Sequence, residues 1–152
     1  MKVSKIQFDK VQKDLIRLRK NLKSMPAWEI EIGVIKDKIN AYRNSVFSLT
    51  SKSNSTITID DILERDETRL NILESNIEYT NFKLNEYKAC LGILDDNEYE
   101  VIDRRYLNIE NKRTSYEKIG EDMYCSQTTV KRWHDISIKK IANYKYGNVD
   151  IA

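Results

Sequence analysis

The sequence has few of the residues that interrupt helices or build metal sites. One proline and four glycines among 152 residues leave few breaks, so we expect a nearly all-helical chain. A single histidine and two cysteines, Cys90 and Cys125, form no zinc-binding pattern, and the cysteines fit reduced thiols of a cytoplasmic protein. No apolar run approaches the roughly 20 residues of a membrane span, and the lysine-rich N-terminus lacks the apolar core of a signal peptide.

Motifs of common catalytic sites are also absent. The chain has no glycine-rich phosphate loop, no nucleophile elbow and no second histidine to act as a base. Its many carboxylates, such as those of Asp95, Asp96, Glu98 and Glu100, fit helix caps and solvated helix faces. We therefore expect no enzymatic activity, no cofactor and no bound metal.

Charge is distributed unevenly along the chain. The formal net charge of +2 combines a basic segment at 1–25, an acidic segment at 60–76 and a second basic segment at 126–147. A phosphate backbone responds to local charge, so both basic ends are candidates for nucleic-acid contact. The N-terminal one is either a second DNA contact or the solvated back of a coiled coil, and we favour the coiled coil.

Apolar residues recur at heptad spacing over the first half of the chain. One seam, from Phe8 to Met25, predicts a helix over about 3–23, and a second, from Trp28 to Val46, predicts another. Proline disfavours helical geometry at the preceding residue, so Pro26 predicts a break between them. We expect these two helices to fold back as an antiparallel hairpin.

A third helix is expected from a cap at Asp60 or Asp61 to about Leu91 or Gly92. Its seam is interrupted by two polar residues, Asp66 and Thr80, which lower stability and can fix the register of a coiled coil. The three seams motivate a homodimer through the N-terminal helices. A monomer in which the seams bury one another is the competing interpretation.

Capping signals predict the next helix. Asp95, with Glu98 three residues later, resembles a capping box. The helix should run from Asn97 to about Leu107 and bury some combination of Tyr99, Ile102 and Tyr106. A polar loop at 108–114 follows.

Two further short helices are then predicted, each beginning after a serine cap. Ser115 caps a helix with Tyr116, Ile119 and Met123 on one side, and Ser126 caps a second helix. The second helix has an inward face of Val130, Trp133, Ile138 and Ile141. Its outward face carries Gln127, Thr128, Lys131 and Arg132, and His134 is predicted to be exposed. A helix-turn-helix with polar and cationic side chains at the start of its second helix suits the major groove, whereas a purely structural pair of helices is the alternative.

Residues 94–144 resemble region 4 of bacterial sigma factors and related helix-turn-helix activators. The resemblance rests on LDDNEYEVIDRRY at 94–106, SYEKIGEDM at 115–123, SQTTVKRW at 126–133 and IKKI at 138–141. A module of this kind after a charged helical N-terminus is similar to the phage and prophage late-gene activators of the ArpU/RinA type. Nothing upstream resembles the sigma region that melts the −10 element, which favours an activator or accessory transcription factor.

The resemblance implies specific DNA contacts. Gln127 would pair with adenine, Arg132 with guanine, and Thr128 with a base or phosphate. Phosphate contacts would come from Lys131, Lys139 and Lys140 in the second helix, with Tyr116 and Lys118 touching the backbone from the first.

The sequence thus predicts a sequence-specific transcriptional regulator in the bacterial cytoplasm, associated with the nucleoid when bound. Residues 1–92, with a flexible connection at 48–58, would serve assembly or interaction, residues 93–147 would bind DNA, and 148–152 would form a tail. Double-stranded DNA and RNA polymerase are the expected partners, and a membrane is not. Two alternatives are a polymerase- or sigma-binding interaction protein and a DNA-packaging protein similar to terminase small subunits.

Overall fold

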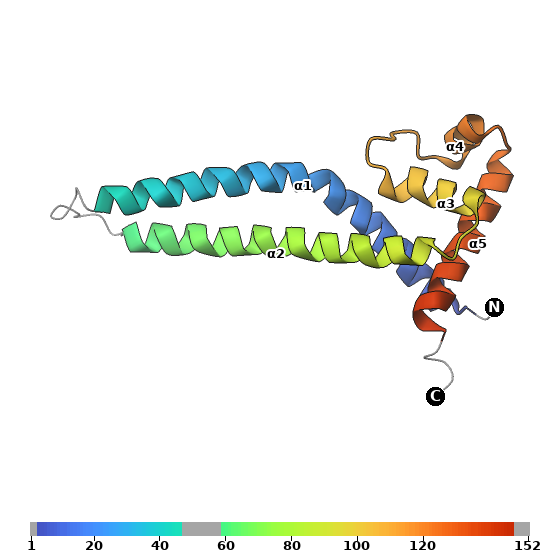
Figure 1. Ribbon diagram of the computed structural model, residues 1–152, viewed down its shortest axis with the longest axis horizontal. Coiled ribbons are helices and arrows are strands. Elements are labelled where there is room, and N and C mark those ends of the chain that lie inside the picture. The colour runs from blue at the N-terminus through green and yellow to red at the C-terminus, as the bar shows by residue number, and fades with distance from the viewer. Residues whose placement is uncertain (1–2, 47–58, 148–152) are drawn as a thin grey trace. The chain divides into compact units, whose positions relative to one another are not determined.

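The computed structural model describes residues 3–46 and 59–147, and within these ranges it contains helices and loops but no strand (Figure 1). The all-α prediction is therefore confirmed. The elements are α1 (Lys5–Val46), α2 (Ile59–Leu91), α3 (Asp96–Ile102), the π-helix η1 (Asp103–Leu107), α4 (Tyr116–Met123) and α5 (Gln127–Tyr146).

The chain divides into two compact units. The first, here called the terminal unit, consists of residues 1–23 and 82–152, and the second, the hairpin unit, consists of residues 24–81. Helices α1 and α2 contribute residues to both units. This division by packing crosses the boundary expected at residue 92. An assembly role for 1–92 and a DNA-binding role for 93–147 remain predictions.

The break predicted at Pro26, and with it the hairpin of two separate N-terminal helices, is wrong. Helix α1 continues without interruption through Pro26, whose side chain lies on the exposed side. An interior proline removes one backbone hydrogen bond and costs about 3 kcal/mol. Apolar residues before and after Pro26 are buried in the cores of the two units, and we infer that this packing outweighs the local cost.

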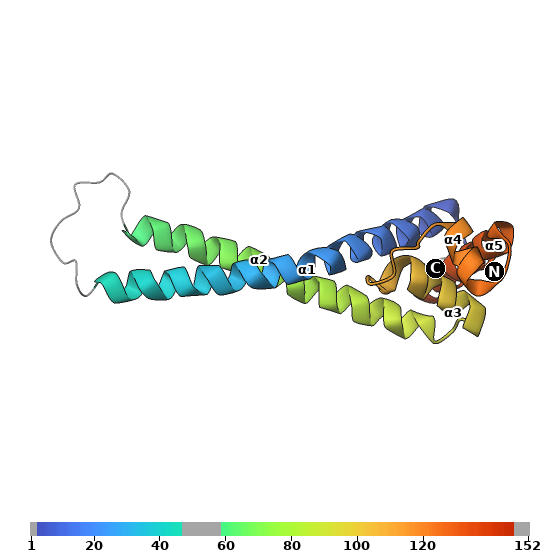
Figure 2. The same cartoon turned by 90° about the horizontal axis from the view of Figure 1, so that it is seen from above.

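In the hairpin unit, α1 and α2 run antiparallel and side by side (Figures 1 and 2). Ile35 and Ile39 of α1 are buried against Leu73 of α2. Four partly buried residues extend this contact: Trp28, Ile32, Leu63 and Leu70. The antiparallel partner of the second half of α1 is therefore α2. The flexible connection predicted at 48–58 lies outside the described residues.

Both polar residues of the α2 seam are buried, as their seam positions predict. Thr80 satisfies its hydroxyl by donating to the Asn76 carbonyl oxygen at 2.7 Å. Asp66 is only 6% exposed, and its Oδ2 atom accepts no hydrogen bond from the described residues, although the Lys38 ammonium lies 3.9 Å away. Asp60 and Asp61 do not cap α2 but occupy its first turn, where carboxylates interact favourably with the helix dipole.

The core of the terminal unit joins distant parts of the sequence. Val11, Leu15 and Leu18 of α1 belong to one buried cluster with Tyr87 and Leu91 of α2. The remaining buried members of this cluster are Cys90, Ile102, Tyr106, Ile138, Ile141 and Ala142. The first five turns of α1 therefore pack in the same core as the last helix of the chain.

These two cores account for the seams that motivated a homodimer. Val11, Leu15 and Leu18 are buried in the terminal unit, while Ile35 and Leu73 are buried in the hairpin unit. All of these contacts are made within one chain. A homodimer through the N-terminal helices remains a prediction, and it would need a surface other than these residues.

Candidate nucleic-acid interface

Helices α4 and α5 begin at the serine caps that the sequence predicts. The Ser115 hydroxyl accepts a hydrogen bond from the Lys118 backbone N–H at 3.2 Å. The Ser126 hydroxyl accepts one from the Thr129 backbone N–H at 3.1 Å and lies 2.8 Å from the Thr129 hydroxyl. Each cap satisfies a backbone donor that the helix leaves unpaired, so the sequence fixes locally where both helices start.

Three residues, 124–126, connect α4 to α5. Tyr124 ends α4 in the left-handed conformation, with φ 57° and ψ 44°, and its side chain is 97% exposed. Gly120 faces this turn, and a Cβ atom at that position would lie 2.8 Å from the Cys125 carbonyl oxygen. The close approach of backbone to backbone explains why glycine stands at position 120.

A small apolar cluster joins α4 and α5 to α3. Its buried members are Val101 of α3, Ile119 of α4 and Val130 of α5. Four partly buried residues pack against them: Tyr116, Met123, Cys125 and Trp133. The predicted inward faces of α4 and α5 are thus confirmed, with Ile138 and Ile141 buried in the neighbouring cluster. Of the residues expected to be buried on the preceding helix, Ile102 and Tyr106 are buried, but Tyr99 is 45% exposed.

The prediction that His134 is exposed is wrong, because this side chain is fully buried. The Tyr106 hydroxyl lies 2.6 Å from His134 Nε2, and the Tyr116 hydroxyl lies 3.2 Å from His134 Nδ1. Asp135 Oδ1 is also 2.9 Å from Nδ1. Burial lowers the pKa of His134 from its ordinary value, although the hydrogen bond to Asp135 opposes this effect. A neutral imidazole therefore ties η1 and α4 to α5.

The capping box predicted at the start of α3 is confirmed and also contacts α5. Asp95 Oδ1 accepts from the Glu98 N–H at 2.8 Å, and Glu98 Oε1 accepts from the Asp95 N–H at 3.0 Å. The Glu98 side chain is nearly buried, and its Oε1 atom also accepts a hydrogen bond from the Lys140 ammonium at 2.5 Å. Lys140, predicted as a phosphate contact, therefore forms an internal ion pair.

Four of the predicted DNA-contacting residues share the exposed face at the start of α5. Gln127, Thr128, Lys131 and Arg132 are all exposed, and among the described residues none of their side chains has a hydrogen-bonding or ion-pair partner. We call these four residues the reading face. Polar and cationic groups with unsatisfied donors are left available to an external ligand.

The remaining predicted contacts divide into two groups. Lys118 of α4 and Lys139 of α5 are exposed and have no partner among the described residues. Tyr116, by contrast, is half-buried, binds His134 through its hydroxyl, and carries the Arg105 guanidinium 4.2 Å from its ring centroid. Tyr116 and Lys140 therefore contribute to packing inside the unit.

Three arginines outside the predicted set of DNA-contacting residues hold the loop at 108–114. Arg19 of α1 donates to the Asn108 and Asn111 carbonyl oxygens at 3.1 and 2.6 Å. Arg105 donates to the Thr114 carbonyl oxygen at 2.6 Å. Arg113 pairs with Asp122 of α4 at 2.9 Å. No periodic signal marks Arg19, because its partners lie about 90 residues further along the chain.

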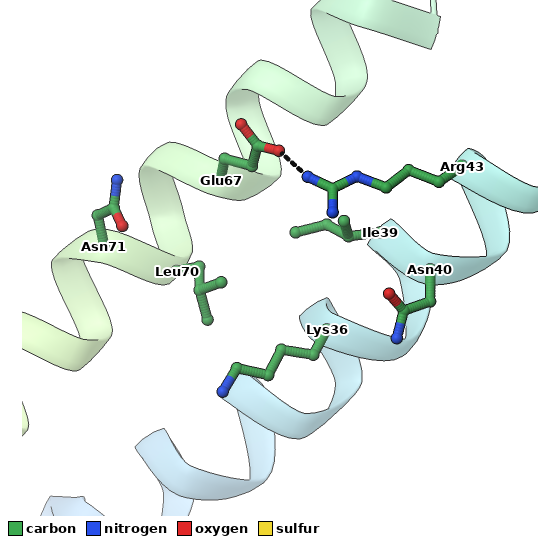
Figure 3. Close-up of a pocket in the computed structure, with 7 residues that line it drawn as sticks. All are labelled: Lys36, Ile39, Asn40, Arg43, Glu67, Leu70 and Asn71. Carbon is green, nitrogen blue, oxygen red and sulfur yellow. Dashed lines mark hydrogen bonds and ion pairs between the residues drawn. The ribbon is translucent and has the colours of Figure 1, made fainter.

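A separate groove lies between the helices of the hairpin unit (Figure 3). Ile39 and Leu70 form its apolar part, while Arg43 and Glu67 make an ion pair of 2.8 Å across it. Of the other charged groups there, the Lys36 ammonium lies 3.6 Å from the carboxylate of Glu74, which is outside the groove lining. Within residues 3–46 and 59–147, no cluster of histidine, cysteine or acidic side chains has the composition of a metal site. None of the helices in these ranges combines the length and apolar character needed to cross a bilayer.

Comparisons with known proteins show no family for this chain. No protein-family model matches it, and no solved structure matches it. A curated protein, the E3 ubiquitin-protein ligase bre1 of Aspergillus fumigatus, is 23% identical over 90 residues, which are 59% of this chain. The chain spans only 12% of the length of that ligase.

Proposed function

We propose that this protein is a sequence-specific DNA-binding transcriptional regulator, and that the reading face of α5 contacts base edges. The observation that carries the proposal is this exposed set of polar and cationic side chains on the first two turns of a capped helix, which have no partner in the part of the chain that the structure describes. The side chains of one helical turn reach into the major groove when a helix enters it at its N-terminal end.

The chemistry of the reading face fits base recognition. The Gln127 amide offers a donor and an acceptor and can pair bidentately with adenine. The Arg132 guanidinium can donate two parallel hydrogen bonds to guanine, while Lys131 and Lys139 suit phosphate oxygens. The segment 126–147 contains five Lys or Arg and one acidic residue. Lys140 pairs with Glu98 and Lys145 with Glu86, which leaves Lys131, Arg132 and Lys139 as its exposed cations.

The packing beneath the reading face supports the same function. Direct readout requires a helix whose orientation does not change when DNA binds. Helix α5 is held by the cluster of Val101, Ile119 and Val130 on one side and by His134 with its two tyrosine partners on another. The resemblance of residues 94–144 to sigma region 4 supports transcription, and phage or prophage genes, as the setting.

The experiment begins with selection and sequencing of genomic fragments bound by the purified protein. Arg132→Ala should weaken binding to the selected site by about 1–3 kcal/mol, a roughly 5- to 150-fold loss of affinity, and relax the preference at one base pair. Arg65→Ala is the matched control, because Arg65 is an exposed arginine of the hairpin unit that pairs with none of the described residues. Unchanged affinity of Arg132→Ala for its operator would refute the proposal. Selected sites beside packaging sequences instead of promoters would refute the transcriptional role.

A further inference from the structure

The first turns of α1 carry exposed cations within the same compact unit as α5. Lys5, Lys13 and Arg17 are exposed, and no described residue pairs with their charged groups. On the opposite side of this segment, Val11, Leu15 and Leu18 are buried in the cluster that contains Ile138 and Ile141 of α5. The basic segment is therefore not the back of an isolated coiled coil.

A shared groove connects this part of α1 to α5. Lys5 and Asp9 of α1 line it together with Asp135 and Lys139 of α5. The carboxylates of Asp9 and Asp135 partly neutralise the groove itself. Lys139 follows Arg132 by seven residues, or two helical turns, so the exposed side of α5 leads from the reading face to Lys5.

Beyond this groove, the exposed side of α1 is cationic. Lys13 and Arg17 follow Asp9 at four-residue intervals, so they lie on the same side of the helix. Asp14, the other acidic residue of 1–25, points inward and accepts a hydrogen bond from the Tyr87 hydroxyl at 2.9 Å. Lys5 to Arg17 spans roughly 18 Å of helix, a length that faces several phosphates of one DNA strand.

We propose that Lys5, Lys13 and Arg17 bind the phosphate backbone of the same DNA duplex whose bases are contacted by the reading face. This inference rests on the function proposed above and adds a second DNA-binding element, 110 or more residues away in the sequence. Charge complementarity identifies the occupant, because these side chains offer donors without acceptors. Phosphate contacts supply affinity and orientation and carry no base preference.

The test uses the full-length double variant Lys13→Gln/Arg17→Gln and a salt titration of DNA binding. The slope of log K against log salt should fall by about 1.8, because each phosphate contact contributes about 0.9. The selected site and an unrelated duplex should lose affinity by the same factor. Lys36→Gln/Arg65→Gln removes the same charges from exposed positions of the hairpin unit and should leave the slope unchanged.

The outcomes separate this inference from the proposed function. An unchanged slope for Lys13→Gln/Arg17→Gln, with wild-type binding intact, overturns the α1 contact and leaves the reading face in place. Wild-type protein without salt-dependent DNA binding overturns both. A second measurement needs no variant: DNA should protect Lys5 and Lys13 of the wild-type protein from an amine-reactive reagent, and Lys36 should be labelled equally with and without DNA. Equal labelling of Lys5 and Lys13 in both conditions also overturns the inference.

Discussion

Loss of charge at two adjacent lysines of α5 should affect two different properties. At Lys140 it should lower the stability of the fold, and at Lys139 it should weaken DNA binding. Lys140 pairs with Glu98, whose side chain is only 3% exposed, whereas Lys139 is exposed and unpaired among the described residues. Removing one partner of a fully buried pair costs 3–5 kcal/mol because a desolvated charge remains. The Lys140 side chain is 31% exposed, so water partly replaces it, and we expect Lys140→Gln to cost about 2 kcal/mol.

Thermal unfolding and DNA binding measure the two effects separately. For a protein of this size, about 2 kcal/mol corresponds to a Tm decrease of about 6 °C. Lys139→Gln should leave Tm unchanged and lower the salt slope of DNA binding by about 0.9 on every sequence. Lys140→Gln should keep the wild-type slope at temperatures where it is folded. An unchanged Tm for Lys140→Gln together with a reduced slope would refute the assignment of Lys140 to an internal ion pair.

Three further predictions concern stability. Because burial lowers the pKa of His134, the unfolded chain takes up a proton at higher pH than the folded one, so the free energy of unfolding should fall as pH drops below about 6.5. Tm measured from pH 7.5 to 5 should show this decrease, and an equally steep decrease in His134→Gln would exclude His134 as its cause. Asp66→Leu should raise Tm, because it replaces a poorly paired buried carboxylate in an apolar seam, with a gain in stability of about 1–4 kcal/mol. A lower Tm would show that an interaction of the Asp66 carboxylate stabilises the fold. Tyr124→Gly should stabilise the protein by about 1 kcal/mol in urea unfolding, because the left-handed conformation strains tyrosine and the exposed ring contributes no packing. Tyr124→Phe keeps the strained backbone and should leave the free energy of unfolding unchanged.

Features set by neighbouring residues could be predicted from the sequence. The caps at Ser115 and Ser126 and the capping box of Asp95 with Glu98 depend on contacts across three residues, and all three are present. The exposure of the reading face also follows from helical spacing. Local chemistry is visible in a sequence because partner and pattern lie within one turn of helix.

Features that depend on distant partners were not predictable in this way. The local preference of Pro26 predicts a break, but packing on both sides of it keeps α1 helical. The polarity of His134 suggests an exposed residue, yet hydroxyls from η1 and α4 bury it. The spacing of His134 nevertheless indicates burial, because it lies four residues after Val130 and four before Ile138, on the inward side of α5.

The shared core of α1 and α5 has a consequence for how the protein is made. Residues 3–23 leave the ribosome well before Ile138, Ile141 and Ala142, whose apolar surface helps to bury them. Contacts of such high sequence separation slow folding, and the nascent N-terminal segment must wait for its partners. For the same reason, a fragment limited to residues 93–147 would expose part of its own core, so a folded terminal unit also requires residues 3–23.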